Sequence, residues 1–183
     1  PPFEPLTAAA QAQLQQLLKN WEQQSKSTTT LECKFKRWHF DMFAAPAGVH
    51  ATHAEGILKY AAPDRGLFRV DTLVFFGGMQ DGKPQYKPLK NQFGEPKQGE
   101  YWVCNGQQII EYVRDLKECN IQDLPKNLQG KQIFNSPLPF VFNLDAAQIQ
   151  QRYWVRQRQP PEGTNVHLIE AWPKLQEDRA QYK

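Results

Sequence analysis

The stretch from Glu100 to Asp123 places the strongest constraint on the fold of this chain. It reads EYWVCNGQQIIEYVRDLKECNIQD, in which short apolar runs are separated by turn residues. Asn105-Gly106 is the strongest short hairpin signal in the sequence, because both residues accept a positive φ. Arg114-Asp115 provides the next turn, and Cys119 and Ile121 continue a third strand. The stretch is therefore predicted to form a three-strand antiparallel meander.

A two-residue turn at Asn105-Gly106 would also fix the register of the first hairpin. Tyr101 would then face Ile110, and Val103 would face Gln108. Successive side chains of a strand point to opposite faces. One face therefore carries the set that we assign to the interior: Tyr101, Val103, Ile110 and Tyr112.

An amphipathic helix is expected near the N-terminus. Thr7 is a good N-cap residue, and the run AAAQAQLQQLLKNWEQQ that follows it is rich in helix formers. Apolar residues recur there at helical spacing and form one stripe: Ala10, Leu14, Leu17, Leu18 and Trp21. The cluster from Ser25 to Thr28 ends the helix, which is expected to pack by its apolar stripe.

Further strands are expected on both sides of the meander. Alternating apolar and polar residues place them at 28–40, 52–60, 67–76, 153–159, 166–174 and from 178 onwards. A PDRG turn at 63–66, with Pro63 at its first corner, joins two of them. The polar segment 77–99 is expected to be an insertion loop with at most two weak strand-like pieces. Because the strand connections are short, the sheet is predicted to be antiparallel.

The first of these strands contains an irregularity. Leu31, Cys33 and Phe35 share one parity, whereas the apolar residues after Lys36-Arg37 have the other. An extra residue in one strand reverses the side-chain alternation, so a β-bulge near Lys36-Arg37 would explain the change. The alternative is that both faces of the strand are covered there.

Two short helices are expected between 135 and 152. Ser136 and Asp145 are suitable N-caps, and Pro137 suits the first helical position. The segment is more apolar than a connector requires, and we interpret its apolar residues as a lid: Leu138, Phe140, Val141, Phe142 and Leu144. A lid of this kind either plugs a filled core or covers a cavity that accepts a ligand.

Composition limits the class of protein. The 183 residues are 40% hydrophobic, which suits one globular domain over 1–183. The 22 basic residues are spread along the chain without a run of five and the net charge is +3, so we expect no nucleic-acid partner. No apolar run approaches the roughly 20 residues of a membrane-spanning helix. The three cysteines contain no CxxC pair and leave open one disulfide with a free thiol or three buried thiols.

With this order of elements, the chain resembles the LolA/LolB-like periplasmic lipoprotein carriers. The resemblance lies in the helix ending at Trp21, followed by LECKFK, GILKY with Pro63 and Phe68-Arg69, the YWVCNGQQIIEY hairpin and FNSPLPFVF. The segment 77–99 and the WPK near the end are closer to an uncharacterised LolA-like group from planctomycete bacteria. Ala62 stands where the carriers have a basic residue.

The resemblance implies an α+β fold: a strongly curved antiparallel sheet, or half-barrel, wrapped around the N-terminal amphipathic helix and short lid helices. It also implies an exported, periplasmic protein that binds a lipid or a lipidated protein between sheet and lid, as a monomer, without catalysis and without a cofactor. Because the strand expected from residue 178 stops at Lys183, the domain is expected to continue beyond that residue. The residues that would line such a cavity are Trp21, Phe35, Leu58, Tyr60, Phe68, Tyr101, Ile110, Tyr112, Phe140 and Phe142.

Two other classes of protein are alternatives. An envelope protein-interaction module with a filled core could use the 77–99 insertion and the two tryptophans expected on the outer face, Trp102 and Trp154. An enzyme would need Cys104 or Cys119 beside a histidine, and no protease signature surrounds either cysteine. His50 and His53 have H-x-x-H spacing, but they lie in a loop leading into a strand, where residues three apart face opposite sides. We therefore predict no metal.

Overall fold

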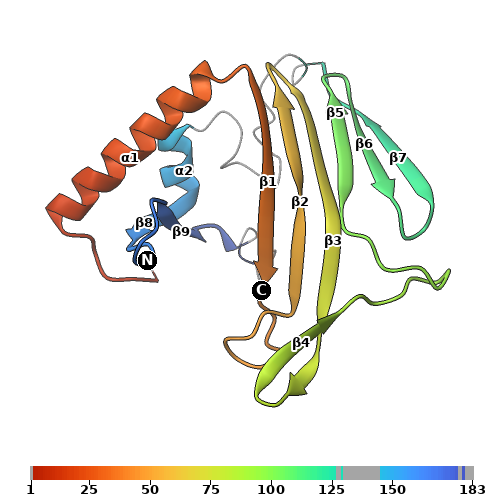
Figure 1. Cartoon of the computed structure of the whole chain (residues 1–183). Helices are drawn as coiled ribbons and strands as arrows, with labels where there is room; N and C mark the ends of the chain where they lie inside the picture. The colour runs from red at the N-terminus through yellow and green to blue at the C-terminus, as the bar shows by residue number, and fades with distance from the viewer. Residues whose placement is uncertain (1, 127–128, 130–144, 177–178, 180–183) are drawn as a thin grey trace. The chain divides into compact units, whose positions relative to one another are not determined.

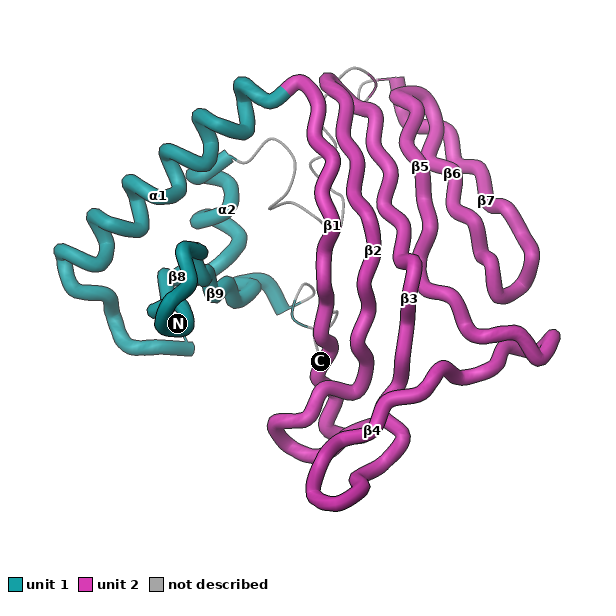
Figure 2. Tube along the Cα trace, in the orientation of Figure 1, with its two compact units in different colours: residues 1–28, 134–183 teal, residues 29–133 magenta. Residues whose placement is uncertain are grey.

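The structure, a computed structural model, describes residues 2–126, 129, 145–176 and 179. The chain divides into two compact units, shown in different colours in Figure 2. Unit 1 combines residues 1–28 with 134–183, and unit 2 is the continuous segment 29–133. The single domain over 1–183 stays a prediction.

Unit 1 is built around the N-terminal helix. Helix α1 spans Ala8–Ser27, and the Thr7 hydroxyl accepts a hydrogen bond from the amide of Ala10 at 3.2 Å, which confirms the predicted cap. Leu14 and Leu18 of the apolar stripe are buried. Neither helix in the described part of the chain is long and apolar enough to cross a membrane.

The stripe of α1 packs within its own unit. Its partners are the buried residues Ile149, Tyr153 and Val155, with Trp21 partly buried at the margin. They come from helix α2 (Ala146–Arg152) and strand β8 (Tyr153–Arg158), which pairs antiparallel with β9 (Leu168–Pro173). Unit 1 therefore has a small core of its own.

Local signals located α2 and its hairpin correctly. The Asp145 carboxylate accepts a hydrogen bond from the amide of Gln148 at 2.9 Å, as predicted for a cap. The other predicted cap, Ser136, lies outside the described residues. The strand expected from residue 178 is wrong where it can be seen, because the Arg179 amide donates to the Leu175 carbonyl, a helical contact.

Unit 2 is one antiparallel sheet, which can be followed by its labels in Figure 1. Its order is β1-β2-β3-β5-β6-β7, with β4 pairing with the far part of β3. Among the described strands β1 and β7 do not pair with each other, so the sheet is not a closed barrel. The whole chain is therefore α+β, as predicted. The strands are β1 (Thr30–His39), β2 (Thr52–Ala61), β3 (Arg65–Gln80), β4 (Lys83–Lys87), β5 (Tyr101–Asn105), β6 (Gln108–Val113) and β7 (Glu118–Asp123).

The meander β5-β6-β7 is confirmed, but its first register was wrong. Val103 pairs with Ile110 instead of Gln108. The Asn105 side chain accepts hydrogen bonds from the amides of Gln107 and Gln108 at 2.9 and 2.8 Å, so Asn105 ends the strand. The turn consequently moves one residue along the chain, to Gly106 (φ +92°) and Gln107.

The segment 77–99 is more ordered than the predicted loop. Strand β3 continues to Gln80 and forms a hairpin with β4 through Asp81 and Gly82, whose φ values of 50° and 72° suit a tight turn. The earlier turn differs as well. Residues 62–64 form it, and the Arg65 and Gly66 expected in it belong to β3.

The β-bulge predicted near Lys36-Arg37 is wrong, and a bulge lies in another strand instead. Lys36 and Arg37 of β1 pair with β2 without a break. The register shift falls between β2 and β3, where Glu55 faces Thr72 and Gly56 faces Val70. Asp71 therefore has no partner in β2 and is the extra residue.

Candidate functional site

The sheet of unit 2 has two faces of different character. From strand alternation and the pairing register, the side chains on the first face are those of Cys33, Phe35, Leu58, Phe68, Val70, Trp102 and Cys104. The second face is defined by Lys34, Ile57, Lys59, Leu67, Arg69, Tyr101 and Val103. The buried members of these two sets, Leu58, Phe68, Val70 and Cys104, all belong to the first face. We therefore take the first face as the apolar face of the sheet.

Three aromatic rings form a continuous ladder across the first face. Phe35 of β1 stacks on Phe68 of β3, with ring centroids 4.7 Å apart and planes within 11°. Phe68 in turn stacks on Trp102 of β5 at 5.6 Å. Stacked aromatic pairs add about 0.5–1.5 kcal/mol to the stabilisation from burial. The ladder therefore couples three strands by side-chain packing as well as by backbone hydrogen bonds.

Small residues of β2 leave room for the ladder. A Cβ atom on Gly56 would lie 2.6 Å from the ring of Phe35 and 2.1 Å from the Arg69 carbonyl oxygen. The first contact shows that the Phe35 ring lies over the glycine, and the second shows that β2 and β3 approach closely next to the bulge. Gly56 is thus required by both the ladder and the backbone.

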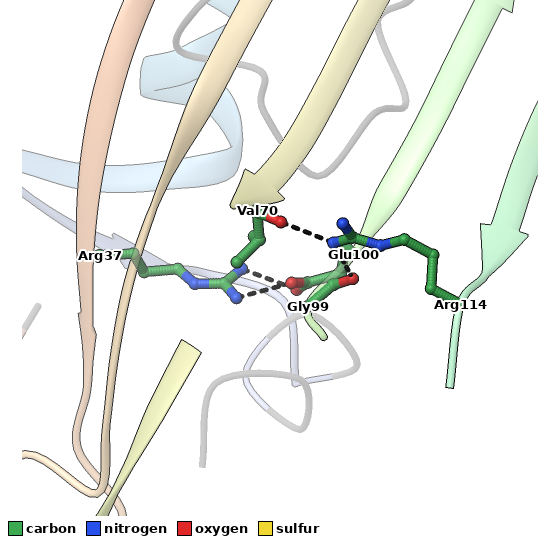
Figure 3. A network of polar contacts seen from close by, with 5 residues as sticks. All are labelled: Arg37, Val70, Gly99, Glu100 and Arg114. Carbon is green, nitrogen blue, oxygen red and sulfur yellow. Dashed lines mark hydrogen bonds and ion pairs between the residues drawn. The ribbon is translucent and has the colours of Figure 1, made fainter. Parts of the chain in front are cut away.

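An ion pair lies beside the ladder. Arg37 of β1 donates two hydrogen bonds to the Glu100 carboxylate, at 2.7 and 2.8 Å (Figure 3). Ala54, directly opposite Arg37 in β2, is small and buried and leaves space for this long side chain. Burial alone would raise the pKa of Glu100, but the Arg37 hydrogen bonds, the residue's own backbone amide and the nearby cations outweigh it. The pKa of this carboxyl is therefore below its ordinary value.

Arg114, in the turn between β6 and β7, binds backbone carbonyls next to Glu100. Its Nη2 donates to the carbonyl oxygens of Val70 and Gly99, at 2.6 and 2.8 Å (Figure 3). Val70 is the last residue before the bulge, and its amide donates to the Glu100 carbonyl at 2.8 Å. Burial lowers the pKa of Arg114. The guanidinium thus satisfies two carbonyls at the point where β3 changes its partner from β5 to β4.

The predicted cavity residues are split between the two faces. Phe35, Leu58 and Phe68 lie together on the first face. Tyr101 and Tyr112 stack on each other at 4.6 Å on the second face, where Arg69 lies over the Tyr101 ring. The assignment of the meander set Tyr101, Val103, Ile110 and Tyr112 to the interior was therefore wrong, although these residues do share a face. Both faces of the meander carry apolar residues, so alternation alone could not tell which one faces the buried side of β3.

The remaining predicted site residues lie elsewhere. Tyr60 shares the parity of the first face at the end of β2, and Trp21 packs in the core of unit 1. Trp102, expected on the outer face, belongs to the ladder instead, because it lies directly opposite Phe68. Trp154 has the opposite parity to the buried Tyr153 and Val155, as predicted. The lid residues Leu138, Phe140, Val141, Phe142 and Leu144 lie outside the described residues.

Sequence reasoning missed an exposed apolar loop between β1 and β2. Met42 is 84% exposed and Phe43 is fully exposed. The loop has a defined conformation, because the Asp41 carboxylate accepts a hydrogen bond from the Phe43 amide, and the Asp41 carbonyl accepts one from Ala45. The apolar run FDMF was visible in the sequence, but nothing local distinguished it from a loop folded back on the sheet.

The histidines and cysteines do not combine into a reactive site in the described part of the chain. His50 stacks on Tyr86 at 4.4 Å and His53 on Trp38 at 5.5 Å, so both belong to an aromatic cluster at one end of unit 2. The Cys104 thiol donates to the Asp64 carbonyl at 3.1 Å, and burial raises the pKa of Cys104. A reactive cysteine needs the opposite shift. Across the described residues, no group of three or more His, Cys, Asp or Glu side chains could hold a metal ion.

The three cysteines are all free thiols, so the alternative with a disulfide is not observed. Cys104 is buried, Cys33 is half-buried and Cys119 is exposed.

Comparisons with known proteins leave the family open. No protein-family model matches the chain, and a search of curated proteins gives no match either. The resemblance to the lipoprotein carriers therefore stays a prediction.

Proposed function

We propose that the protein binds a hydrophobic ligand, a lipid or the acyl chain of a lipidated protein, without catalysis and in a carrier-like role in the cell envelope. The observation that carries the proposal is the aromatic ladder of Phe35, Phe68 and Trp102 on the apolar face of an open sheet. An apolar surface of this kind binds an acyl chain without a specific polar anchor, because each CH₂ group removed from water contributes about 0.8 kcal/mol.

The proposal includes the arrangement of the sheet and the lid. In it the sheet curves as a half-barrel around α1, and the segment 138–144 acts as the lid over the ligand. Export to the periplasm follows from the family resemblance. The Arg37–Glu100 ion pair supports the proposal, because it connects β1 to the residue before β5 and so helps to keep the apolar surface preformed. A ligand that binds a preformed surface has fewer protein groups to order.

The test is native mass spectrometry of the purified protein, with solvent extraction of bound lipid and titration with a fluorescent fatty acyl probe. Phe35→Gln makes the ladder polar at a half-buried position and should lower acyl uptake at least about tenfold. Tyr112→Gln is the matched control on the second face and should leave uptake unchanged. Circular dichroism verifies that both variants fold. A clean mass together with no uptake by the wild type would exclude the carrier function.

The exposed loop favours a second candidate, an envelope protein-interaction module. Phe40, Met42 and Phe43 are all more than half exposed and lie in one hydrogen-bonded loop. Ordered apolar side chains of this kind are typical of contact surfaces. For this candidate, the variant Met42→Ser with Phe43→Ser should lose a protein partner that the wild type captures, while acyl uptake stays unchanged.

A further inference from the structure

The second face of the sheet contains an open hollow of about 580 Å³. Its twelve lining residues form three adjacent rows across β1, β2, β3 and β5. The two outer rows direct side chains into the hollow, whereas the middle row has its side chains on the first face and contributes only backbone. Ala61 in one outer row is small, so the hollow is least filled by side chains where it crosses β2.

One wall of the hollow is apolar where it crosses β3 and β5, and the rim of the hollow is charged. Leu67 and Val103 face each other across β3 and β5 and are both half-buried. On the rim, Lys59 forms an ion pair with Glu32 at 2.9 Å. Arg65, at the start of β3, is exposed and has no ion-pair partner among the described residues. The rim therefore offers one cation that is available to an anionic ligand.

We propose that this hollow binds a small apolar monocarboxylate, with its chain over Leu67 and Val103 and its carboxylate at Arg65. A guanidinium binds a carboxylate through two parallel hydrogen bonds, which an ammonium cannot do. The volume lies within the usual range of ligand pockets, about 300–1,000 Å³. Leu67 lies about 7 Å from Arg65 along β3, and Val103 lies one strand spacing of about 5 Å further, which suits a chain of medium length. The site lies on the face opposite to the aromatic ladder, so it does not depend on the proposed function of that face.

The charge at Arg65 can be tested with ligands of one chain length and different head groups. Octanoate should bind several-fold more tightly than octanol, and octylammonium should bind most weakly. In methyl NMR spectra of the labelled protein, octanoate should shift the signals of Leu67 and Val103. Each CH₂ added between hexanoate and octanoate should tighten binding by up to about fourfold.

Two variants distinguish the contribution of the Arg65 charge to binding from that of the volume of the hollow. Arg65→Glu should weaken octanoate binding by about tenfold and leave octanol binding unchanged, since an exposed carboxylate pair is lost and replaced by repulsion. Ala61→Trp fills the hollow and should weaken the binding of both ligands. Lys83→Glu makes the same charge change at an exposed position of β4 and should have no effect.

Three results would overturn the proposal. They are equal binding of octanoate and octylammonium, ligand-induced shifts that leave Leu67 and Val103 unaffected, and octanoate binding that Arg65→Glu does not change. The variant Phe35→Gln distinguishes this hollow from the proposed acyl site on the first face. It should lower uptake of the long acyl probe while the octanoate shifts at Leu67 and Val103 persist, so either site can fail without the other.

Discussion

Removing the central ring of the ladder should destabilise unit 2 strongly. Phe68 is only 6% exposed and stacks on Phe35 at 4.7 Å and on Trp102 at 5.6 Å. Phe68→Ala loses the buried ring, creates a cavity and breaks both stacks, and such substitutions usually cost about 3–5 kcal/mol. We expect about 3–4 kcal/mol, a large part of the 5–15 kcal/mol that holds a typical domain folded.

The assay must report on unit 2 alone, because a chain with two compact units need not unfold in one step. Amide hydrogen exchange of peptides from β2, β3 and β5, followed by mass spectrometry, measures the opening free energy of the sheet itself. A loss of 3 kcal/mol should accelerate exchange from the globally opened state by more than about 100-fold.

Phe43→Ala is the matched control for this experiment. It removes the same ring from the same unit, but Phe43 is fully exposed. Its cost should therefore stay within about 0.5 kcal/mol. A change in the opening free energy of less than about 1 kcal/mol for Phe68→Ala, or equal effects of the two substitutions, would refute the stabilising role of the ladder.

Three further predictions concern the turn, the ion pair and the thiols. Gly106→Ala should cost about 2–3 kcal/mol, because its backbone has φ +92° and its Cβ would lie 2.8 Å from the Asp64 carboxylate. Gly82→Ala, with φ +72° and open space, should cost only about 1 kcal/mol in the same hydrogen-exchange assay. The pKa of Glu100 is lowered in the folded state, so its stabilisation should be complete above the ordinary glutamate pKa of about 4.3 and be lost as the pH falls through the folded value. The stability difference between wild type and Glu100→Gln should accordingly shrink on acidification, and a difference that stays constant between pH 6 and 3 would contradict this. In timed maleimide labelling read by peptide mass, Cys119 should react first and Cys104 only after the sheet opens, since Cys104 is buried and burial raises its pKa.

Local chemistry predicted the features that depend on neighbours in sequence. Thr7 and Asp145 cap helices as expected, because a cap needs only one side chain and an amide two or three residues away. The strands of the meander follow from apolar alternation in the same way. The turn at Gly106 was misplaced by one residue, because the second hydrogen bond to the Asn105 side chain has no signature in the sequence.

Features that depend on distant residues could not be predicted from the pattern. The bulge at Asp71 is defined by the pairing of β3 with β2, which the sequence of β3 alone does not show. The apolar face of the meander is selected by Phe68, which lies 34 positions before Trp102 in the sequence and directly opposite it in the sheet. Arg37 and Glu100 are 63 residues apart, so no local spacing connects them.

The polar contacts around Glu100 explain how an open sheet can keep an apolar face in register. Next to the Asp71 bulge the pairing of β3 with β5 ends, and β3 pairs with β4 further along, so backbone pairing to β5 no longer holds β3 there. Arg37 holds Glu100 from β1, and Arg114 holds Val70 and Gly99 from the other side. The hydrogen bonds of Arg37 and Arg114 are separate from the aromatic stacks of the ladder. Together these hydrogen bonds connect β1, β3 and the residues just before β5. Weakening them should therefore loosen the face that carries the ladder while every ladder ring is retained. If acyl binding depends on a preformed surface, Arg114→Gln should lower acyl affinity through this loss of order, with the ladder sequence unchanged.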